Sequence, residues 1–353
     1  MTDFDLNIHA ELVYDGGDVV HVPERLGTPR ADQMQGTPLE KLAELAGRVC
    51  YDSLGKGRSS ADYHEHIREV KHLSVYEHCV RTVELSEVSA FDVVPVLMSF
   101  LNRPGVFVRE SSGSALRVTL NLRALLEWKR YLYGYVCHGV LVEAFYPFVP
   151  TLRAALEDGC EDDYRMTSRA MEPEDDDERW ITLLMCGSRG MSHELVRHGD
   201  FTAISQRSTR YVDESESPWV EHPLVTQKLR PPIDGESQKH PAIVGYGSVQ
   251  HFARCGYVDV RDALDFAGAT RKQARGAARG LLGNALYTEV VFSASVRQWR
   301  YMLQARCSDA ADAEIRVLFA RALKELQRSR HGDRFADLRL RPAQDGIGDV
   351  LDS

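Results

Sequence analysis

Cysteine pairs at metal-binding or redox spacing are absent from this 353-residue sequence, which has no Cys-x-x-Cys motif. The cysteines are odd in number and widely spaced, at Cys50, Cys79, Cys137, Cys160, Cys186, Cys255 and Cys307. This pattern argues against a disulfide framework and against a structural zinc site. It is typical of reduced thiols in a cytosolic protein.

The histidines also lack the spacing of a metal site. His193 and His198 are five residues apart, whereas the zinc-binding His-Glu-x-x-His motif places its histidines four apart. The extra residue turns the second side chain away by roughly 100° on a helix. His72 and His78 do not suit one helix face either. No metal site is therefore predicted.

Long apolar runs are missing as well. No stretch is long enough to cross a bilayer, and the residues after Met1 are polar and acidic, unlike a secretory signal. Hydrophobic residues make up 43% of the chain and charged residues 27%, as in ordinary globular proteins. We expect a cytoplasmic protein that has no membrane partner.

Positive charge is scarce, with 43 lysines and arginines against 52 aspartates and glutamates and a net charge of −9. A protein that binds nucleic acid broadly needs an extended basic face, so nucleic acid is not an expected partner. An anionic small molecule is not excluded, because its binding needs only a few local arginines.

Residues 194–211 bring such arginines together. The segment holds Arg197, Arg207 and Arg210 together with His198 and several small hydroxyl residues. Arginine presents a fixed fork of donors that matches phosphate, and serine and threonine add short donors beside it. Two interpretations stay open at this point: a loop that holds a phosphorylated ligand, or a solvated loop with surface ion pairs.

Hydrophobic periodicity predicts a mixture of helices and strands. Helices are expected near residues 42–50, 61–70, 91–101, 122–133, 191–196, 259–267, 269–282 and 315–326. Strands are expected within residues 1–36 and near 80–85, 116–120, 180–186 and 287–296. Residues 213–245 are expected to be irregular, and the polar tail after His331 is expected to fray.

Three motifs, in order, resemble those of the flavin-dependent thymidylate synthases (the ThyX family). Residues 197–211 run Arg-His-Gly, eight residues, then Ser-Thr-Arg-Tyr, with Gly199 where the family has a second arginine. Residues 72–78 resemble the early motif His-x-Ser/Thr-Val/Pro-x-Glu-His. Residues 269–318 resemble the second signature, with Gly283 in place of proline and Ser295 in place of asparagine.

The resemblance implies the family's α/β (α+β) fold, in which helices pack on a mixed, mainly antiparallel sheet. It implies one domain over residues 1–353, in which residues 90–179 are an insertion that compact members lack. The apolar content of residues 135–156 indicates that this insertion is folded, and the acidic run 172–178 is expected to be solvated and mobile. The resemblance also implies a homotetramer with FAD at subunit junctions.

The implied reaction is the transfer of a one-carbon unit from 5,10-methylenetetrahydrofolate to C5 of a uracil nucleotide, with NADPH-reduced FAD supplying hydride. Uracil C5 is a poor nucleophile while N3 is protonated. A guanidinium beside N3 favours the anion and pushes electron density toward C5. By resemblance Arg306 is this catalytic group, and His72 lies beside the flavin and the folate.

The resemblance assigns further binding residues. FAD contacts carry over to Ser74, Arg197, His198, Gly199, Ser295, Arg297 and Tyr301. Nucleotide contacts carry over to Glu194, Gln206, Ser208, Thr209, Arg210, Arg279 and Arg306, with Arg279 coming from another subunit. Gly199 keeps a backbone amide but lacks a cation, so weaker or rearranged FAD binding is expected unless the insertion supplies a replacement.

Several hypotheses remain at the level of sequence. The first is an active uracil-nucleotide C5-methylase acting on dUMP or on UMP, as in relatives from polyoxin-type antibiotic biosynthesis. The alternative is a non-catalytic flavin- or nucleotide-binding homologue, against which the presence of Arg306 and His72 weighs. The arginines at 271, 275 and 279 form a basic surface stripe or a phosphate-facing edge. A nucleic-acid binder is disfavoured by net charge and by the absence of interleaved aromatics.

Overall fold

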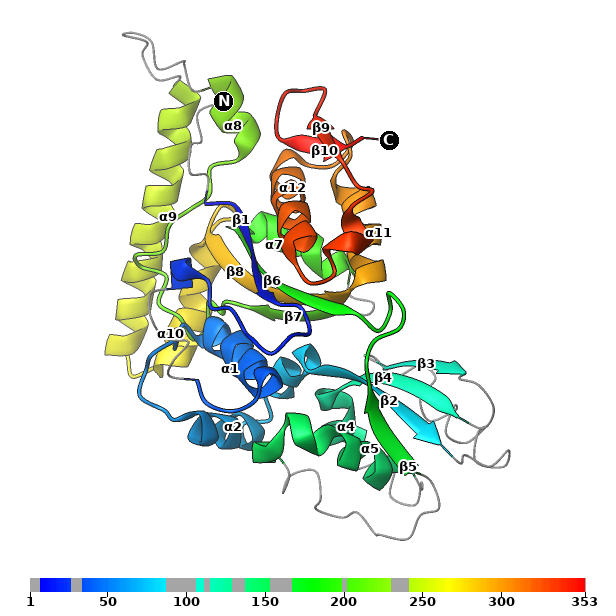
Figure 1. Ribbon diagram of the computed structural model, residues 1–353. Coiled ribbons are helices and arrows are strands. Elements are labelled where there is room, and N and C mark those ends of the chain that lie inside the picture. Colours follow the sequence, from blue (N-terminus) through cyan, green and yellow to red (C-terminus); the bar gives the residue numbers. More distant parts are fainter. Residues whose placement is uncertain are drawn as a thin grey trace.

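The computed structural model describes residues 7–26, 34–86, 106–110, 115–128, 137–152, 167–198, 202–229 and 241–352. Within these ranges the strands form two four-stranded sheets and a two-stranded hairpin (Figure 1). All the strand pairs of these sheets are antiparallel. The α/β fold with mainly antiparallel strands is thus confirmed, although the strands divide into two main sheets.

The first sheet lies at the centre of the molecule and has the order β1-β6-β8-β7. Its strands are β1 (His9–Tyr14), β6 (Trp180–Ser188), β8 (Tyr287–Ser295) and β7 (Thr202–Gln206). Alternate residues of β6 enter opposite cores, since Leu183 packs in one apolar cluster and Leu184 in the other. Helices must therefore cover both faces of this sheet.

Three helices cover one face: α7 (Arg189–Leu195), α11 (Val296–Arg306) and α12 (Ala313–Arg328). α12 buries the apolar stripe predicted from its sequence, including Leu318, Phe319 and Leu326. At the centre of this core Trp299 is fully buried and donates its indole N–H to the carbonyl of Ile181 at 3.0 Å. α11 is thereby fixed against β6.

The opposite face is covered by α1 (Pro38–Tyr51) and by the 3-10 helix η3 (Leu73–His78). α1 begins with a capping box, in which Thr37 accepts from the backbone N–H of Glu40 and the Glu40 side chain accepts from that of Thr37. Pro38 occupies the first turn, where no N–H is needed. α2 (Ser60–Glu69) packs closely on α1.

The second sheet has the order β3-β4-β2-β5. Its strands are β3 (Val106–Glu110), β4 (Leu116–Asn121), β2 (Val80–Ser86) and β5 (Thr167–Met171). Residues 90–179 therefore supply three of the four strands, together with α4 (Leu122–Trp128) and α5 (Cys137–Phe145). The expected folded character of this segment is confirmed over its described residues. Figure 1 shows this sheet and its helices below the first sheet.

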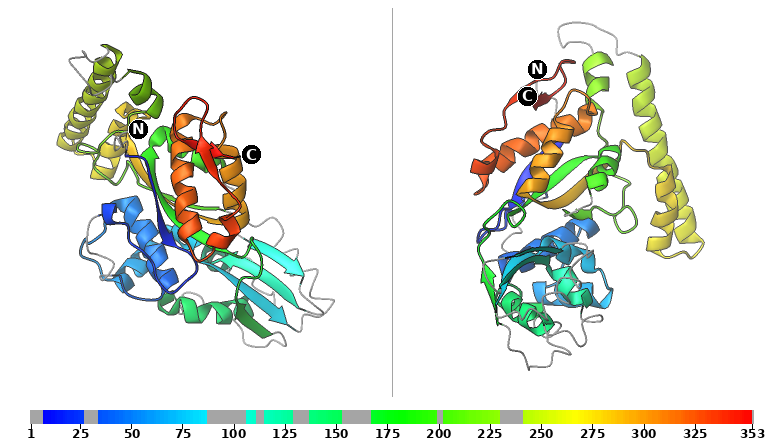
Figure 2. Two further views of the ribbon diagram at one scale, coloured as in Figure 1. Left: turned by 45° about the horizontal axis from the view of Figure 1, so that its top comes forward. Right: turned by 90° about the vertical axis from the view of Figure 1, so that its right-hand side faces the viewer.

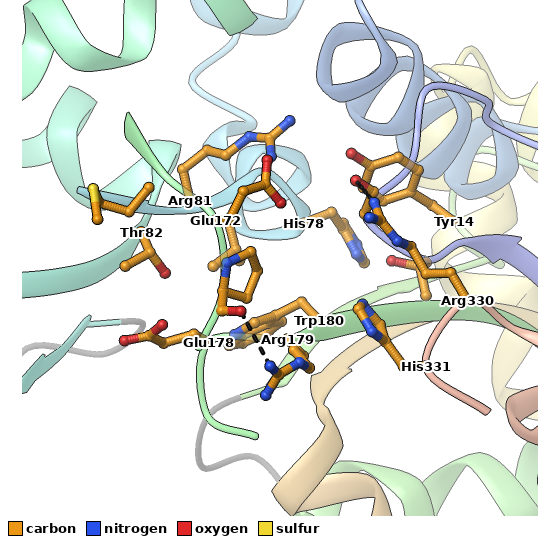
Figure 3. Close-up of a pocket in the computed structure, with 15 residues that line it drawn as sticks. Tyr14, His78, Arg81, Thr82, Glu172, Glu178, Arg179, Trp180, Arg330 and His331 are labelled. Carbon is orange, nitrogen blue, oxygen red and sulfur yellow. Dashed lines mark hydrogen bonds between the residues drawn. The ribbon is translucent and has the colours of Figure 1, made fainter. Parts of the chain in front are cut away.

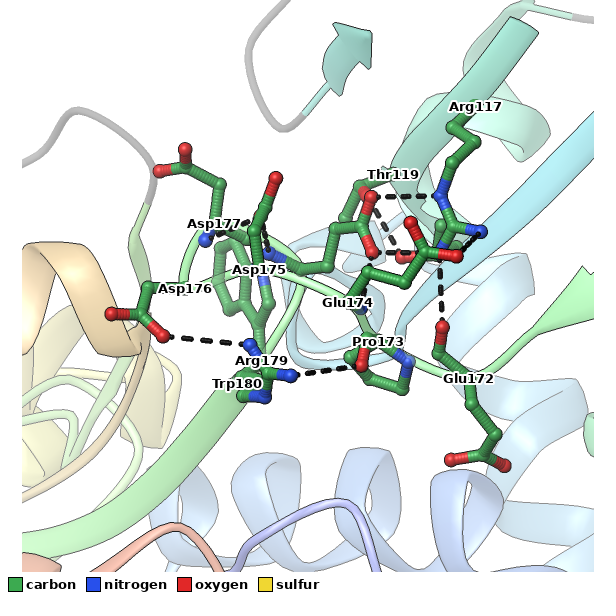
Figure 4. Close-up of polar contacts among 12 residues, drawn as sticks. Arg117, Thr119, Glu172, Pro173, Glu174, Asp175, Asp176, Asp177, Arg179 and Trp180 are labelled. Carbon is green, nitrogen blue, oxygen red and sulfur yellow. Dashed lines mark hydrogen bonds and ion pairs between the residues drawn. The ribbon is translucent and has the colours of Figure 1, made fainter. Parts of the chain in front are cut away.

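The acidic run before β6 is not the solvated, mobile loop expected from its composition. Arg117 of β4, whose side chain is 2% exposed, binds both carboxylate oxygens of Glu178 at 3.0 and 2.8 Å. The same guanidinium binds Glu174 at 3.0 Å and the carbonyl of Glu172 at 2.9 Å (Figure 4). The run folds because a buried arginine of the inserted segment neutralises and orders it.

Residues 213–245 are not wholly irregular, since α8 (Pro223–Leu229) and the start of α9 (Pro241–Phe266) fall within them. α9 is longer than the predicted helix at 259–267. It lies along the outside of the molecule (Figure 2) and exposes Val249, Phe252 and Phe266. Because α9 buries only Ile243 and Tyr257, its start has little apolar periodicity to read. α10 (Arg271–Ala278) falls within the helix predicted at 269–282 and packs against α9.

The tail after His331 does not fray. It forms η8 (Gly332–Phe335) and a hairpin of β9 (Leu340–Pro342) and β10 (Asp349–Leu351). Phe335, Ile347 and Val350 are buried, so a few apolar residues between polar ones hold the tail on the protein. The helix expected at 91–101 lies outside the described residues, and the one expected at 122–133 is described to Trp128.

Candidate functional site

Arg306 lies where two elements of the first sheet's helical face converge. α11 begins at the end of β8, opposite the start of β6, and returns along the sheet toward α7. Arg306, its last residue, donates from Nη1 to the Glu194 carboxylate at 2.7 Å and from Nε to His198 Nε2 at 2.8 Å. The structure thus joins Glu194 and Arg306, predicted to bind the nucleotide, with His198, predicted to bind FAD.

His198 is an acceptor in this cluster and therefore carries no proton on Nε2. Burial and the adjacent Arg306 charge lower its pKa below the usual range, which keeps the ring neutral. Tyr301, one turn earlier on α11, meets the His198 ring edge-to-face at 6.1 Å and is 59% exposed. Nη2 of Arg306 has no hydrogen-bond partner among the described residues, so donors remain for a ligand.

A second cluster forms around the end of α1. The Tyr51 hydroxyl lies 3.0 Å from His72 Nδ1, and the Tyr51 ring packs edge-to-face on Tyr211 at 4.8 Å. The backbone N–H of Ser208 donates to the carbonyl of Cys50 at 2.9 Å. His72 and the Ser208–Tyr211 turn are therefore neighbours across Tyr51. Burial and then the charge of Arg123 lower the pKa of His72.

The arginines near this turn differ in what they bind. Arg207 is enclosed by the carboxylates of Asp52, Glu214 and Glu289 at 3.5–3.8 Å, so it is structural. Arg210 and Arg279 are exposed and form no ion pair with any residue that the structure describes. These two cations are the ones available to an anionic ligand.

The remaining residues that were predicted to bind the nucleotide lie close to this turn. Thr209 is buried and Ser208 accepts from the backbone N–H of Arg210 at 3.3 Å. The Gln206 amide donates to Ser192 at 2.9 Å and to Thr288 at 3.1 Å, which fixes its orientation. Of the basic stripe, Arg275 donates to the carbonyl of Tyr211 and pairs with Asp213 at 3.4 Å. α10 is thereby tied to this turn.

Ser295 and Arg297 lie at the opposite end of α11 from Arg306. Arg306 follows Arg297 by nine positions, which corresponds to about 14 Å of helix. Ser295 is buried and caps α11 by accepting from the N–H of Gln298 at 3.2 Å. Arg297 pairs with Asp177 at 2.8 Å beside a cavity of about 450 Å³. Within one chain Ser295 and Arg297 are therefore separated from Arg197 and His198, the other end of the predicted FAD set.

The inserted segment contributes to this second end. Phe107 of β3 and Thr119 of β4 line the same cavity as Ser295 and Arg297. Of the other predicted FAD residues, Arg197 is exposed and Ser74 is half-buried in η3. Gly199 lies outside the described residues, so its expected effect on FAD binding stays a prediction.

Two polar residues here were not singled out from the sequence. Arg189, at the start of α7, lies near Arg279, and burial and the charge of Arg279 lower its pKa. His78 is completely buried and is bridged by Ser293 at 2.7 Å and Ser205 at 3.0 Å, with its pKa lowered by burial to about 3. Arg189 stands in no motif. The motif at 72–78 contained His78 but gave it no role.

No described group of three or more histidine, cysteine, aspartate or glutamate side chains is arranged to hold a metal ion. None of the helices in the described ranges is both long and apolar enough to cross a membrane. Cys50, Cys79, Cys186, Cys255 and Cys307 are free thiols.

The fold and this arginine-rich site define an α/β protein suited to a phosphorylated ligand, and comparison with known proteins narrows that class. Residues 180–329 match the family model described as thymidylate synthase complementing protein. Over this segment the chain is similar to the flavin-dependent thymidylate synthases.

Curated relatives show the same similarity. A flavin-dependent thymidylate synthase of Mycobacterium sp. (strain KMS) is 34% identical over 170 residues, 45% of this chain and 62% of the relative. The protein of that name from Corynebacterium diphtheriae is 36% identical over 147 residues, 40% of this chain and 54% of the relative. The chain thus spans little more than half the length of these relatives.

Proposed function

We propose that this protein is a flavin-dependent methyltransferase that methylates C5 of a uracil nucleotide, with dUMP as the main substrate. 5,10-Methylenetetrahydrofolate is the carbon donor, and NADPH reduces the bound FAD. The observation that carries the proposal is the Arg306 cluster. Its guanidinium is held by Glu194 and His198 and keeps a free donor edge, within a segment that matches the family.

Arg306 activates the pyrimidine in this proposal. Its unpaired Nη2 donates to the uracil edge at N3 and the adjacent carbonyl and stabilises the N3 anion. Glu194 and His198 occupy the other donors and so fix the plane of the guanidinium, which limits the motion lost on binding. The nucleotide phosphate is bound by Ser208, Thr209 and Arg210, with Arg279 from another subunit.

Of the arginines predicted to contact FAD, Arg197 is available to a ligand and Arg297 is already paired. Arg197, an exposed cation without an ion-pair partner among the described residues, lies beside His198 and suits a diphosphate. Arg297 is already paired with Asp177, so a flavin phosphate has to displace that carboxylate. Bound flavin would supply the hydride, and His72, which lies 3.0 Å from the Tyr51 hydroxyl, would be one of the residues that hold it.

The proposal includes a homotetramer. Ser295 and Arg297 lie about 14 Å along α11 from Arg306, a separation that agrees with flavin and nucleotide contacts contributed by different chains. The apolar side chains exposed on α9 offer a surface for such assembly. Light scattering coupled to gel filtration tests this, and a monomer at micromolar concentration contradicts it.

The activity is tested by competition. Purified protein receives FAD, NADPH, methylenetetrahydrofolate and equal dUMP and UMP, and the nucleotide products are weighed by mass spectrometry. Predominant dTMP is the expected result. Substantial 5-methyl-UMP moves the assignment to a UMP methylase of the antibiotic-biosynthesis type. Flavin-loaded protein that yields no methylated nucleotide contradicts the proposal and favours a binding-only homologue.

A further inference from the structure

A separate cavity of about 260 Å³ lies between the two sheets. Residues of β1, β2, β6, the acidic run and the segment after α12 meet there, although they are far apart in the sequence. Figure 3 shows Tyr14, Arg330 and His331 on one side of it and Arg81 and Glu172 on the other. No residue assigned to the nucleotide or the flavin lines this cavity.

Three arginines line the cavity, and they differ in how far they are already satisfied. Arg179 binds the carbonyl of Pro173 at 3.1 Å and lies 3.5 Å from the Asp176 carboxylate. Arg330 donates from Nη1 to the carbonyl of Gly16 at 2.8 Å. Arg81 stacks on the Phe148 ring at 4.0 Å and forms no ion pair with a described carboxylate. Positive charge is thus left over at Arg81 and Arg330.

Two buried polar atoms lack partners. The Tyr14 hydroxyl and Arg81 Nε have no hydrogen-bond partner among the described residues, and Tyr14 is only 5% exposed. A buried polar group without a partner is destabilising, so such groups in folded proteins usually bind water or a ligand. Burial raises the pKa of Tyr14 and Arg81 opposes the shift, which leaves the phenol a donor at neutral pH.

The carboxylates and histidines of the cavity do not cancel this charge. Glu178 is bound through both oxygens to Arg117, and the Glu172 side chain is exposed to solvent. His78 has both ring nitrogens bonded to serine hydroxyls. His331 has its pKa lowered by burial and by Arg330, so it stays neutral. The cavity therefore presents cations and hydrogen-bond donors to a ligand.

We propose that this cavity is a binding site for a small oxyanion, held by Arg81, Arg330 and the Tyr14 hydroxyl. Arginine matches the paired oxygens of phosphate and carboxylate groups, and the phenol adds a third donor. The volume is below the roughly 300–1,000 Å³ of sites for drug-sized ligands, so the ligand is small. The site is distinct from the proposed nucleotide site and binds its ligand whether or not the protein is a methyltransferase.

The experiment is calorimetric titration of the full-length protein with inorganic phosphate, and separately with succinate, at constant ionic strength maintained with chloride. Saturable binding of either probe is expected, and the comparison distinguishes a phosphate from a carboxylate ligand. Arg81→Gln is expected to weaken binding at least about tenfold, and Tyr14→Phe several-fold, because each removes a donor to a charged group. Tyr14→Phe preserves the buried ring and so tests the site even where Arg81→Gln disturbs folding.

Two controls separate this site from others. Arg210→Gln removes a cation of the proposed nucleotide site and is expected to leave binding in the cavity unchanged. Arg328→Gln removes an exposed arginine of α12 and is also expected to have no effect. The inference is overturned if neither probe binds, or if binding is lost in Arg210→Gln and retained in Arg81→Gln and Tyr14→Phe.

Discussion

At the scale of the residue, arginines close in sequence have different uses that only their neighbours distinguish. Arg207 is surrounded by three carboxylates, whereas Arg210, three positions later, is exposed and forms no ion pair in the described part of the chain. Arg306 is intermediate, since one carboxylate and one neutral imidazole hold it and one edge stays open. A guanidinium that has only some of its hydrogen-bond donors occupied suits a group that must bind a transient anion.

Arg306→Lys is expected to lower kcat for nucleotide methylation by about 10²- to 10³-fold. Losses of this size are typical when a donor that stabilises developing charge is removed. Lysine carries the charge but cannot contact Glu194, His198 and the pyrimidine in one plane. The measurement is product formation by the flavin-loaded variant. Arg300→Lys, on the same helix and paired with Asp337 at 2.6 Å, is the matched control and should stay close to the native rate. Equal losses in the two variants would contradict a specific role for Arg306.

Replacement of glycine by alanine is expected to change stability in opposite directions at Gly47 and Gly247. A Cβ at Gly47 of α1 would lie 1.7 Å from the Tyr63 hydroxyl and 3.2 Å from Val75, both buried. Gly47→Ala should therefore destabilise the protein by about 1–3 kcal/mol through overpacking. Gly247, on exposed α9, has nothing within 4 Å of the same position. Gly247→Ala should stabilise by roughly 0.5–1 kcal/mol, because alanine favours helix. Urea denaturation measures both, and changes of the same sign would refute this account.

The site residues illustrate what a sequence can and cannot predict. The motifs assigned Glu194 and Arg306 to the nucleotide and His198 to FAD, and the structure places these three side chains in contact. They could not show that Ser295 is a buried helix cap or that Arg297 is paired with Asp177, because partners depend on the fold. Arg189 and His78 were missed because their surroundings come from distant strands and helices.

At the scale of the element, α12 could be predicted from its local sequence pattern, whereas the structure of the acidic run 172–178 could not. α12 was predicted because its apolar stripe repeats at helical spacing and meets the core directly. The run 172–178 looked solvated because its composition is acidic. Its carboxylates meet distant arginines, chiefly Arg117 (Figure 4) and also Arg297, which no local pattern connects to the run. The tail after His331 was misjudged for a similar reason, since its few apolar residues are buried only through tertiary contact.

Arg117→Met should destabilise the protein by about 3–5 kcal/mol. It leaves Glu178, whose side chain is 1% exposed, buried without its cation. The double variant Arg117→Met/Glu178→Leu should recover most of that loss, because the pair is then replaced by apolar packing. Chemical denaturation gives the free energies of unfolding. Lys56→Met is the control, since its 68% exposed side chain pairs with Asp52, which is 53% exposed, and should contribute at most about 1 kcal/mol. A double variant as unstable as the single one would argue against this account.

At the scale of the whole molecule, the segment from η3 to β2 connects the two sheets. η3 packs on the first sheet, and β2 begins two residues after it in the second. His78, the last residue of η3, hydrogen-bonds to Ser205 of β7 and Ser293 of β8. Ser293 also lies 2.6 Å from Thr182 of β6. One neutral imidazole thus joins this connection to three strands of the central sheet.

That bridge predicts a pH dependence of stability. The pKa of His78 is lowered from 6.5 to about 3 by burial, so in this window the unfolded chain binds a proton that the folded protein does not. The contribution of His78 is therefore complete above pH 6.5 and is lost as pH falls toward 3, at up to about 1.4 kcal/mol per pH unit. Between pH 7 and pH 5 this amounts to at most about 2 kcal/mol.

The measurement is urea denaturation of native protein and His78→Asn at pH 7 and pH 5. Asparagine retains a donor and an acceptor for the two serines but does not titrate. The variant is expected to be less stable at pH 7 yet to lose less stability on acidification. Other histidines contribute equally to both proteins, including His64 with a lowered pKa and His222, whose pKa Asp312 raises. The difference between the two slopes therefore isolates His78. Identical slopes would mean that the imidazole is protonated in the folded state, and one of its serine contacts would then have to be remade.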